Sequence, residues 1–250
     1  MNLFDRSGIA VRLSKIAIVT VSLYWSVILP ARGDAKGIDA RSTQTKISSP
    51  PRSPSSPKVP IFDALIVPGK KVGAITPKTT YTDLVKIFGK QRLTAKKVYG
   101  PEGQVEFPGT LITLGKNRSL TVTWKNSKKL QPLWVVIADP AFKTASGIGI
   151  GTSLAKLRQI LGEFKITGLY WDYGNMVVNL SPAIQARYTG LSILVDADRY
   201  AARQFPKDLQ AVTGDGVTPA ANDPHWKSLK MHVSALSVYF PEIRSPKTGK

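Results

Sequence analysis

The sequence contains no cysteine in its 250 residues, and only two histidines, His225 and His232. The absence of cysteine excludes disulfide bonds and a lipid-modified N-terminal cysteine. The two histidines stand seven residues apart, which is not the spacing of zinc ligands. We therefore expect no metal site and no cofactor, and a folded body that its core alone holds together.

Acidic residues are also scarce. The chain carries 16 Asp and Glu against 35 Lys and Arg, a net charge of +19 at pH 7. Residues 61–144 hold fourteen basic and five acidic residues, whereas residues 145–250 hold twelve and eight. The first half of the body is therefore the more basic half, and its natural partners are anionic.

Long apolar runs are confined to the start of the chain. Arg6, Arg12 and Lys15 precede fourteen uncharged residues, 16–29, and small residues follow them. This order is typical of a secretory signal peptide. The uncharged stretch between Lys15 and Arg32 has sixteen residues, fewer than the ~20 that a membrane-spanning helix needs.

We therefore expect residues 1–35 to be a cleaved signal peptide and the protein to be secreted or periplasmic in a bacterium. The alternative is an N-terminally anchored membrane protein, whose only membrane contact is the uncleaved signal. Residues 36–60 follow as a basic segment, and thirteen of the twenty residues 41–60 are Ser, Thr or Pro. Such a composition buries too little apolar surface to fold, so a disordered linker is predicted there.

An internal repeat is the most informative pattern in the body. Residues 79–89 align with residues 152–162 at a constant offset of 73. In each copy a hydroxyl residue in an N-cap position precedes apolar residues spaced on one helical face, and a glycine ends the motif. The capping residues are Thr80 and Ser153, and the glycines are Gly89 and Gly162. The repeat predicts two short helices.

Runs rich in β-branched and aromatic residues follow each predicted helix. They are 111–114, 120–124 and 133–137 in the first copy, and 164–167, 176–180, 191–195 and 233–240 in the second. The sequence therefore predicts an α+β fold of two tandem units, 61–144 and 145–250, each a short helix packed on a mostly antiparallel sheet. An insertion near 200–232 has no clear pattern.

Two families share these features. A Thr- or Ser-capped helix that ends in Phe88-Gly89 or Leu161-Gly162 and precedes an antiparallel sheet resembles the unit of the small outer-membrane assembly lipoproteins. The β-lactamase inhibitory protein contains that unit in tandem, although its cysteine pairs are absent here. Residues 147–157 and 168–174 also resemble a group of uncharacterised exported bacterial proteins. The resemblance covers about residues 67–180 and implies a fold and a compartment rather than a function.

An aromatic cluster, Tyr170-Trp171-Asp172-Tyr173, precedes Gly174. Aromatic side chains beside a turn can present flat rings to a sugar or to a protein partner. The alternative is that one or two of these rings cap the core of the sheet. If the body has a binding site, these four residues are the first candidates.

Basic residues form the second set of candidates. The binding candidates among them are Lys96, Lys97, Lys128 and Lys129, in a wider set with Lys70, Lys71, Lys86, Lys90, Arg92 and Lys125. A basic face on an exported protein favours an anionic envelope polymer or another envelope protein as the partner. No specific nucleic acid is expected, because no recognition module accompanies the charge. The alternative is a generally solvated basic surface.

Catalytic signatures are weak. His225, Asp223 and Ser228 are the residue types of a Ser-His-Asp catalytic triad. No Gly-x-Ser-x-Gly motif accompanies them, so no catalytic residue is assigned. We therefore expect a non-enzymatic exported binding or envelope-associated protein. The two alternatives are a hydrolase of envelope polymer that uses Asp172 and Glu163, and a structural scaffold without a ligand.

Overall fold

The computed structural model describes residues 63–100, 103, 105–171 and 174–241. The predicted signal peptide and linker lie outside these residues. The described part combines helices with antiparallel sheets, which confirms the α+β class. No helix in it has the length and hydropathy to cross a membrane.

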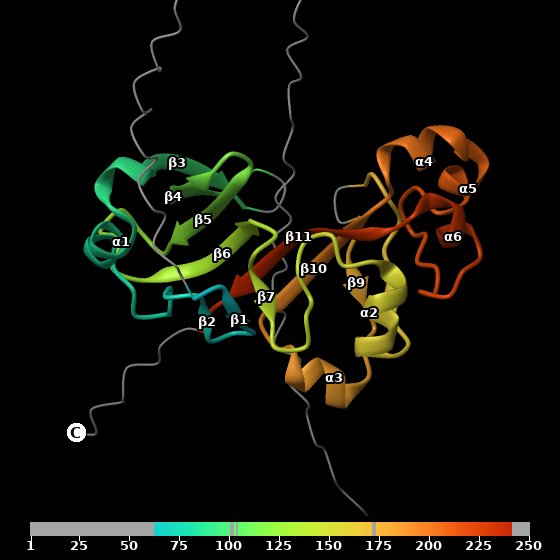
Figure 1. The fold of residues 1–250 in the computed structure, drawn as a ribbon, viewed down its shortest axis with the longest axis horizontal. Coiled ribbons are helices and arrows are strands. Elements are labelled where there is room, and N and C mark those ends of the chain that lie inside the picture. Colours follow the sequence, from blue (N-terminus) through green and yellow to red (C-terminus); the bar gives the residue numbers. More distant parts are fainter. Residues whose placement is uncertain (1–62, 101–102, 104, 172–173, 242–250) are drawn as a thin grey trace, which may run out of the picture.

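The main sheet has six antiparallel strands in the order β10-β11-β6-β5-β4-β3 (Figure 1). Their bounds are β3 Leu93–Tyr99, β4 Glu106–Gly115, β5 Arg118–Trp124, β6 Pro132–Ala138, β10 Leu191–Asp196 and β11 His232–Tyr239. Strand β11 pairs with β6 on one side and with β10 on the other. Strands of both predicted units thus form one sheet, and a division into two tandem units is not confirmed.

One face of this sheet carries an apolar row that crosses all six strands. Directly paired residues point to the same face of a sheet. The row consists of Leu93, Ile112, Leu120, Ile137, Leu236 and Ile193. Five of these six side chains are fully or almost fully buried, and each contributes roughly 1.5–3 kcal/mol to stability. They form one cluster with side chains of the two repeat helices, so this face is the core face.

The two helices predicted from the repeat are α1 (Tyr81–Phe88) and α2 (Leu154–Leu161). The N-caps are confirmed: the Asp83 N–H donates to Thr80 Oγ1 at 3.2 Å, and the Lys156 N–H donates to Ser153 Oγ at 3.2 Å. Gly89 and Gly162 have positive φ, +82° and +74°, as the sequence predicts. Their ψ values of 139° and −142°, however, lie outside the left-handed helical region, in a part of the map that only glycine adopts readily.

Short elements surround the main sheet. Strands β1 (Leu65–Val67), β2 (Lys71–Val72) and β7 (Lys143–Thr144) form a small sheet in which β1 runs parallel to β7. Strands β8 (Lys165–Ile166) and β9 (Val177–Val178) pair antiparallel. A short 3-10 helix (Lys90–Arg92) leads into β3, and α3 (Pro182–Arg187) precedes β10.

The unassigned insertion folds into three short helices, α4 (Arg199–Gln204), α5 (Pro206–Ala211) and α6 (His225–Leu229). They gather at the end of the molecule that lies far from α1 (Figure 1). The insertion connects β10 to β11, so it places α6 close to the start of the last strand.

Candidate functional site

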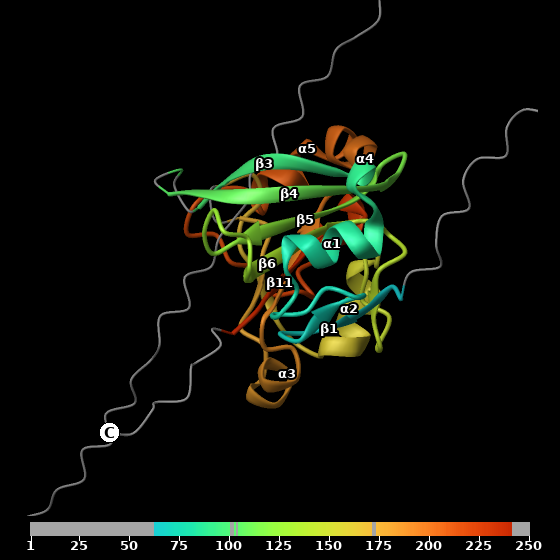
Figure 2. The ribbon, with the colours of Figure 1, turned by 90° about the vertical axis from the view of Figure 1, so that its left-hand side faces the viewer.

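The register of the main sheet brings two basic segments together. Lys96 of β3 pairs with Gly109 of β4, and Gly109 pairs with Thr123 near the end of β5. The residues that follow β5 therefore emerge at the same end of the sheet as the second half of β3. In Figure 2 the end of β3 and the β5–β6 connection lie on the same side of the sheet. We call the lysines there the basic sheet end: Lys96, Lys97, Lys125, Lys128 and Lys129.

Two lysines of the basic sheet end contact other side chains, and two others are exposed. Lys97 Nζ lies 3.0 Å from Glu106 Oε2, and the hydrogen bond to Glu106 raises the pKa of Lys97. Lys129 Nζ lies 5.0 Å from the centroid of the Tyr81 ring, a cation–π contact. The side chains of Lys96 and Lys128 are exposed to solvent. The positive charges of Lys96 and Lys128 are therefore available to a partner.

The remaining basic candidates do not join this end. Lys86 and Lys90 lie at the C-terminal end of α1 and just beyond it, and Arg92 precedes the start of β3. They therefore lie at the opposite end of that strand. Lys71 lies in β2 and pairs with Asp63 at 2.7 Å, and Lys70 precedes it. The ten predicted residues are thus spread over more than one face.

The aromatic cluster lies away from the basic sheet end. Tyr170 and Trp171 are 56% and 54% exposed, so neither ring caps the core. The Tyr170 N–H donates to Asn175 Oδ1 at 3.0 Å, and burial together with the neighbouring Asp196 raises the pKa of Tyr170 to about 12. Asp172 and Tyr173 lie outside the described residues.

The positions along β11 separate these two candidate regions. Asp196, the neighbour of Tyr170, pairs with His232 at the start of β11. Tyr239, at the other end of β11, pairs with Trp134, which in turn pairs with Thr123 beside the basic sheet end. The eight residues of β11 span roughly 26 Å at about 3.3 Å per residue. One small ligand cannot contact both regions.

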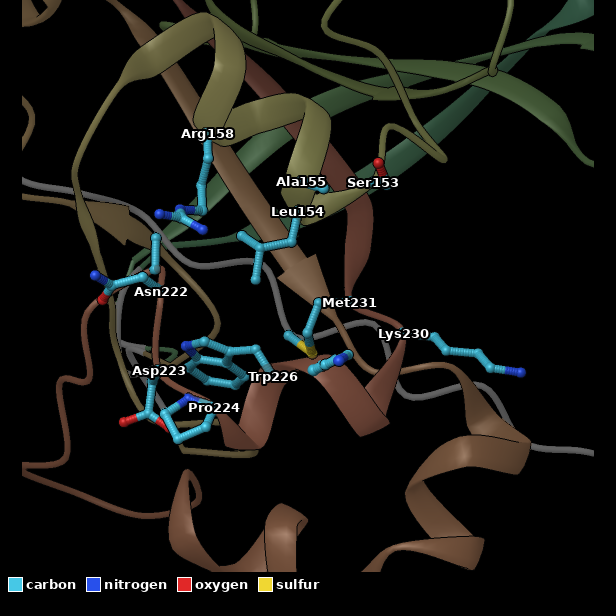
Figure 3. Close-up of a pocket in the computed structure, with 12 residues that line it drawn as sticks. Ser153, Leu154, Ala155, Arg158, Asn222, Asp223, Pro224, Trp226, Lys230 and Met231 are labelled. Carbon is cyan, nitrogen blue, oxygen red and sulfur yellow. The ribbon is translucent and has the colours of Figure 1, made fainter.

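A pocket of about 420 Å³ lies between α2 and α6, and nothing in the sequence pointed to it (Figure 3). Its apolar lining consists of Leu154, Ala155, Ala221, Pro224, Trp226 and Met231, and its polar lining of Ser153, Arg158, Asn222, Asp223, Lys227 and Lys230. These residues come from segments more than sixty positions apart, one of them inside the unassigned insertion. The spacing of residues within any one segment of the sequence therefore could not predict this pocket.

The suggested catalytic triad is not what the structure contains. His225 Nδ1 lies 2.8 Å from Asp208 Oδ1, and Ser228 Oγ donates to Asp208 Oδ2 at 2.5 Å. The serine and the histidine thus both bind one carboxylate, while Asp223 Oδ1 accepts the backbone N–H of His225 at 3.0 Å. A nucleophilic serine needs its hydroxyl on the imidazole. The arrangement instead joins α5 to α6.

The structure also bears on the hydrolase alternative and on metal binding. Glu163, one carboxylate of the hydrolase alternative, is 71% exposed and accepts from Arg158 Nη2 at 3.2 Å. Asp172, the other carboxylate, lies outside the described residues. Within the described residues, no three His, Asp or Glu side chains gather in a way that could hold a metal ion.

Comparison with known proteins adds no assignment. No family model, no curated protein and no solved structure matches the chain significantly. The resemblance to the tandem lipoprotein unit and to exported proteins of the same kind stays a prediction from sequence.

Proposed function

We propose that the protein is an exported, non-enzymatic binding protein that contacts an anionic polymer of the bacterial envelope. The basic sheet end makes the contact. One observation carries the proposal: the antiparallel register brings five lysines from two separate segments to one end of the sheet, where the side chains of Lys96 and Lys128 are exposed. The signal-like residues 1–35 support the compartment.

The physics favours a polymer over a small ion. An exposed ion pair contributes only about 0.2–1 kcal/mol, so a single anionic group binds weakly to any one of these lysines. A chain of regularly spaced anionic groups contacts several lysines at once and gains from each of them. The excess of basic over acidic residues in both ranges of the body, fourteen against five in 61–144 and twelve against eight in 145–250, adds long-range attraction to such a polymer.

The test is a titration of the protein without residues 1–35 against polygalacturonate, with neutral dextran as the control polymer. Binding is measured by calorimetry in 20 mM and in 500 mM NaCl. We expect binding to polygalacturonate that weakens steeply as salt rises, because exposed charges are screened over a few ångströms at high ionic strength. Absence of binding at 20 mM salt would contradict the proposal.

A matched pair of variants locates the surface. Lys96→Gln with Lys128→Gln removes two exposed charges from the basic sheet end, and Lys156→Gln with Lys165→Gln removes two exposed charges elsewhere. At about 0.2–1 kcal/mol per contact, the first pair weakens binding about two- to thirty-fold. The second pair leaves binding nearly unchanged. Equal weakening by both pairs would show that only the overall charge matters.

A further inference from the structure

The pocket between α2 and α6 lies apart from the basic sheet end, and its chemistry is different. Its interior is apolar: Leu154 and Ala155 come from α2, while Trp226 and Met231 come from α6 and the residue before β11 (Figure 3). The indole N–H of Trp226 already donates to the Ala220 carbonyl at 2.9 Å. The ring therefore offers the pocket an apolar surface. A volume of about 420 Å³ lies within the range of small-molecule sites.

Arg158, which lines the pocket, has an unused hydrogen-bond donor. Its Nη2 donates to Glu163 Oε1 at 3.2 Å, but its Nε–H is buried and has no partner in the described structure. Nε–H and Nη2–H together form one edge of the guanidinium, which matches the two oxygens of a carboxylate. Here only half of that edge is used. A buried donor without a partner is costly, so an acceptor at this position is favoured.

The other polar groups favour an anion as well. Three basic side chains, Arg158, Lys227 and Lys230, line the pocket against one acidic side chain, Asp223. Asp223 Oδ1 already accepts the His225 N–H. Figure 3 shows the Arg158 guanidinium on the same side of the pocket as Asn222, while Lys230 points away from Trp226. The anionic group of a ligand is therefore expected at Arg158.

We propose that the α2–α6 pocket binds a small amphiphilic carboxylate, with the carboxylate on the Nε–Nη2 edge of Arg158 and the apolar body against Leu154, Trp226 and Met231. The ligand carboxylate replaces the single contact of the exposed Glu163 with two hydrogen bonds. The site is independent of polymer binding at the basic sheet end, because the two share no residue.

Octanoate is the probe, measured by calorimetry on the protein without residues 1–35. Acetate keeps the carboxylate but lacks the long apolar chain. 1-Octanol and octyltrimethylammonium keep the apolar chain but replace the carboxylate with a neutral or a positively charged head group. We expect saturable binding of octanoate, with the other three compounds at least ten-fold weaker. Binding of 1-octanol as tight as that of octanoate would overturn the assigned head-group recognition, and binding of acetate as tight as that of octanoate would overturn the apolar part of the site.

Four variants complete the test. Arg158→Gln is expected to weaken octanoate at least ten-fold and to leave 1-octanol unchanged. Glu163→Gln is expected to tighten octanoate binding, because it removes the negative charge that competes for Arg158. Ala155→Phe, at an exposed helix position, fills the pocket and abolishes binding without a change in the core. Lys165→Gln is the matched surface control. Unaltered octanoate binding in Arg158→Gln, or weaker binding in Glu163→Gln, would overturn the proposal.

The test also separates this site from the proposed function. The Lys96→Gln, Lys128→Gln variant is expected to weaken polygalacturonate binding about two- to thirty-fold and to leave octanoate binding unchanged. Arg158→Gln is expected to weaken octanoate binding at least ten-fold and to leave polygalacturonate binding unchanged. Weaker binding of both ligands in either variant would show that the two sites are not independent.

Discussion

At the scale of single residues, two threonines in the main sheet have similar burial and opposite roles. Thr110 Oγ1 accepts the indole N–H of Trp124 at 2.9 Å, and both residues are buried. Thr123 is also fully buried, but its Oγ1 has no hydrogen-bond partner in the described structure, and neither has the indole nitrogen of its paired neighbour Trp134. One hydroxyl thus satisfies a buried donor, while the other is a polar group buried at a cost.

These two threonines give a matched prediction. Thr110→Val leaves the Trp124 N–H buried without an acceptor, so we expect a loss of about 1–3 kcal/mol in the free energy of unfolding. Thr123→Val removes an unsatisfied hydroxyl from the interior and is expected to be neutral or stabilising. Urea denaturation of the two variants measures both effects. A similar loss of unfolding free energy in both variants would mean that the hydrogen bond between Thr110 and Trp124 does not contribute to stability.

At the scale of elements, local signals were predictable from sequence and non-local ones were not. Helices α1 and α2 and strands β4, β5, β6, β10 and β11 follow from caps, helical spacing and β-branched runs, and the structure has them. Strand β3 was missed because Lys96 and Lys97 give it no apolar alternation. Lysine is common in edge strands, where it opposes pairing with other chains. Strand β3 lies at an edge of the six-stranded sheet.

The helices of the insertion were missed for a different reason. Helices α5 and α6 have six and five residues, too few for a helical period to stand out, and neither has a side-chain N-cap. The α2–α6 pocket depends on α6, so it could not be predicted either. The aromatic cluster was found because it is contiguous in sequence. The lysines of the basic sheet end were recognised as candidates, but which of them lie together depends on strand register.

The link between α5 and α6 gives a prediction for pH. The hydrogen bonds that Asp208 accepts from Ser228 and His225 lower the pKa of Asp208, and the bond to Asp208 raises the pKa of His225. The raised pKa of His225 contributes stability that is complete below its ordinary pKa of 6.5 and is lost as pH rises through the folded value. The lowered pKa of Asp208 contributes stability above its ordinary pKa of 3.8, which is lost as pH falls through the folded value.

We therefore expect the link to be strongest between pH 3.8 and pH 6.5. Hydrogen exchange of the α6 amides, corrected for intrinsic rates, should show greater protection at pH 5 than at pH 8. Asp208→Asn is expected to remove this difference. Asp215→Asn, in an exposed turn, is the control and should keep it. Protection of α6 that is independent of pH in the unsubstituted protein would contradict the prediction.

At the scale of the whole molecule, the shared sheet makes the body cooperative. Val238 and Leu236 of β11 pair with Val135 and Ile137 of β6, and the apolar row continues from these strands to both repeat helices. A break between residues 144 and 145 would remove β10 and β11 and expose the inner strand β6. Neither range alone retains the six-stranded sheet.

Calorimetry tests this cooperativity. We expect the protein without residues 1–35 to unfold in one transition whose calorimetric and van't Hoff enthalpies agree. A fragment of residues 36–144 is expected to show no cooperative transition. It lacks β11, so Val135 and Ile137 of β6 lose the strand with which they pair. Two separate transitions in the longer protein, or a stable fragment, would instead establish two independent units.

The position of β11 also determines when the protein can fold. This strand is the last to be synthesised, yet it lies between β10 and β6 rather than at an edge. A growing chain that ends before residue 232 leaves two bare strand edges and an open core, and such edges invite pairing with other chains. The six-stranded sheet can therefore close only after β11 has left the ribosome. If the proposed export begins before that point, no closed sheet has to be unfolded for the chain to cross the membrane.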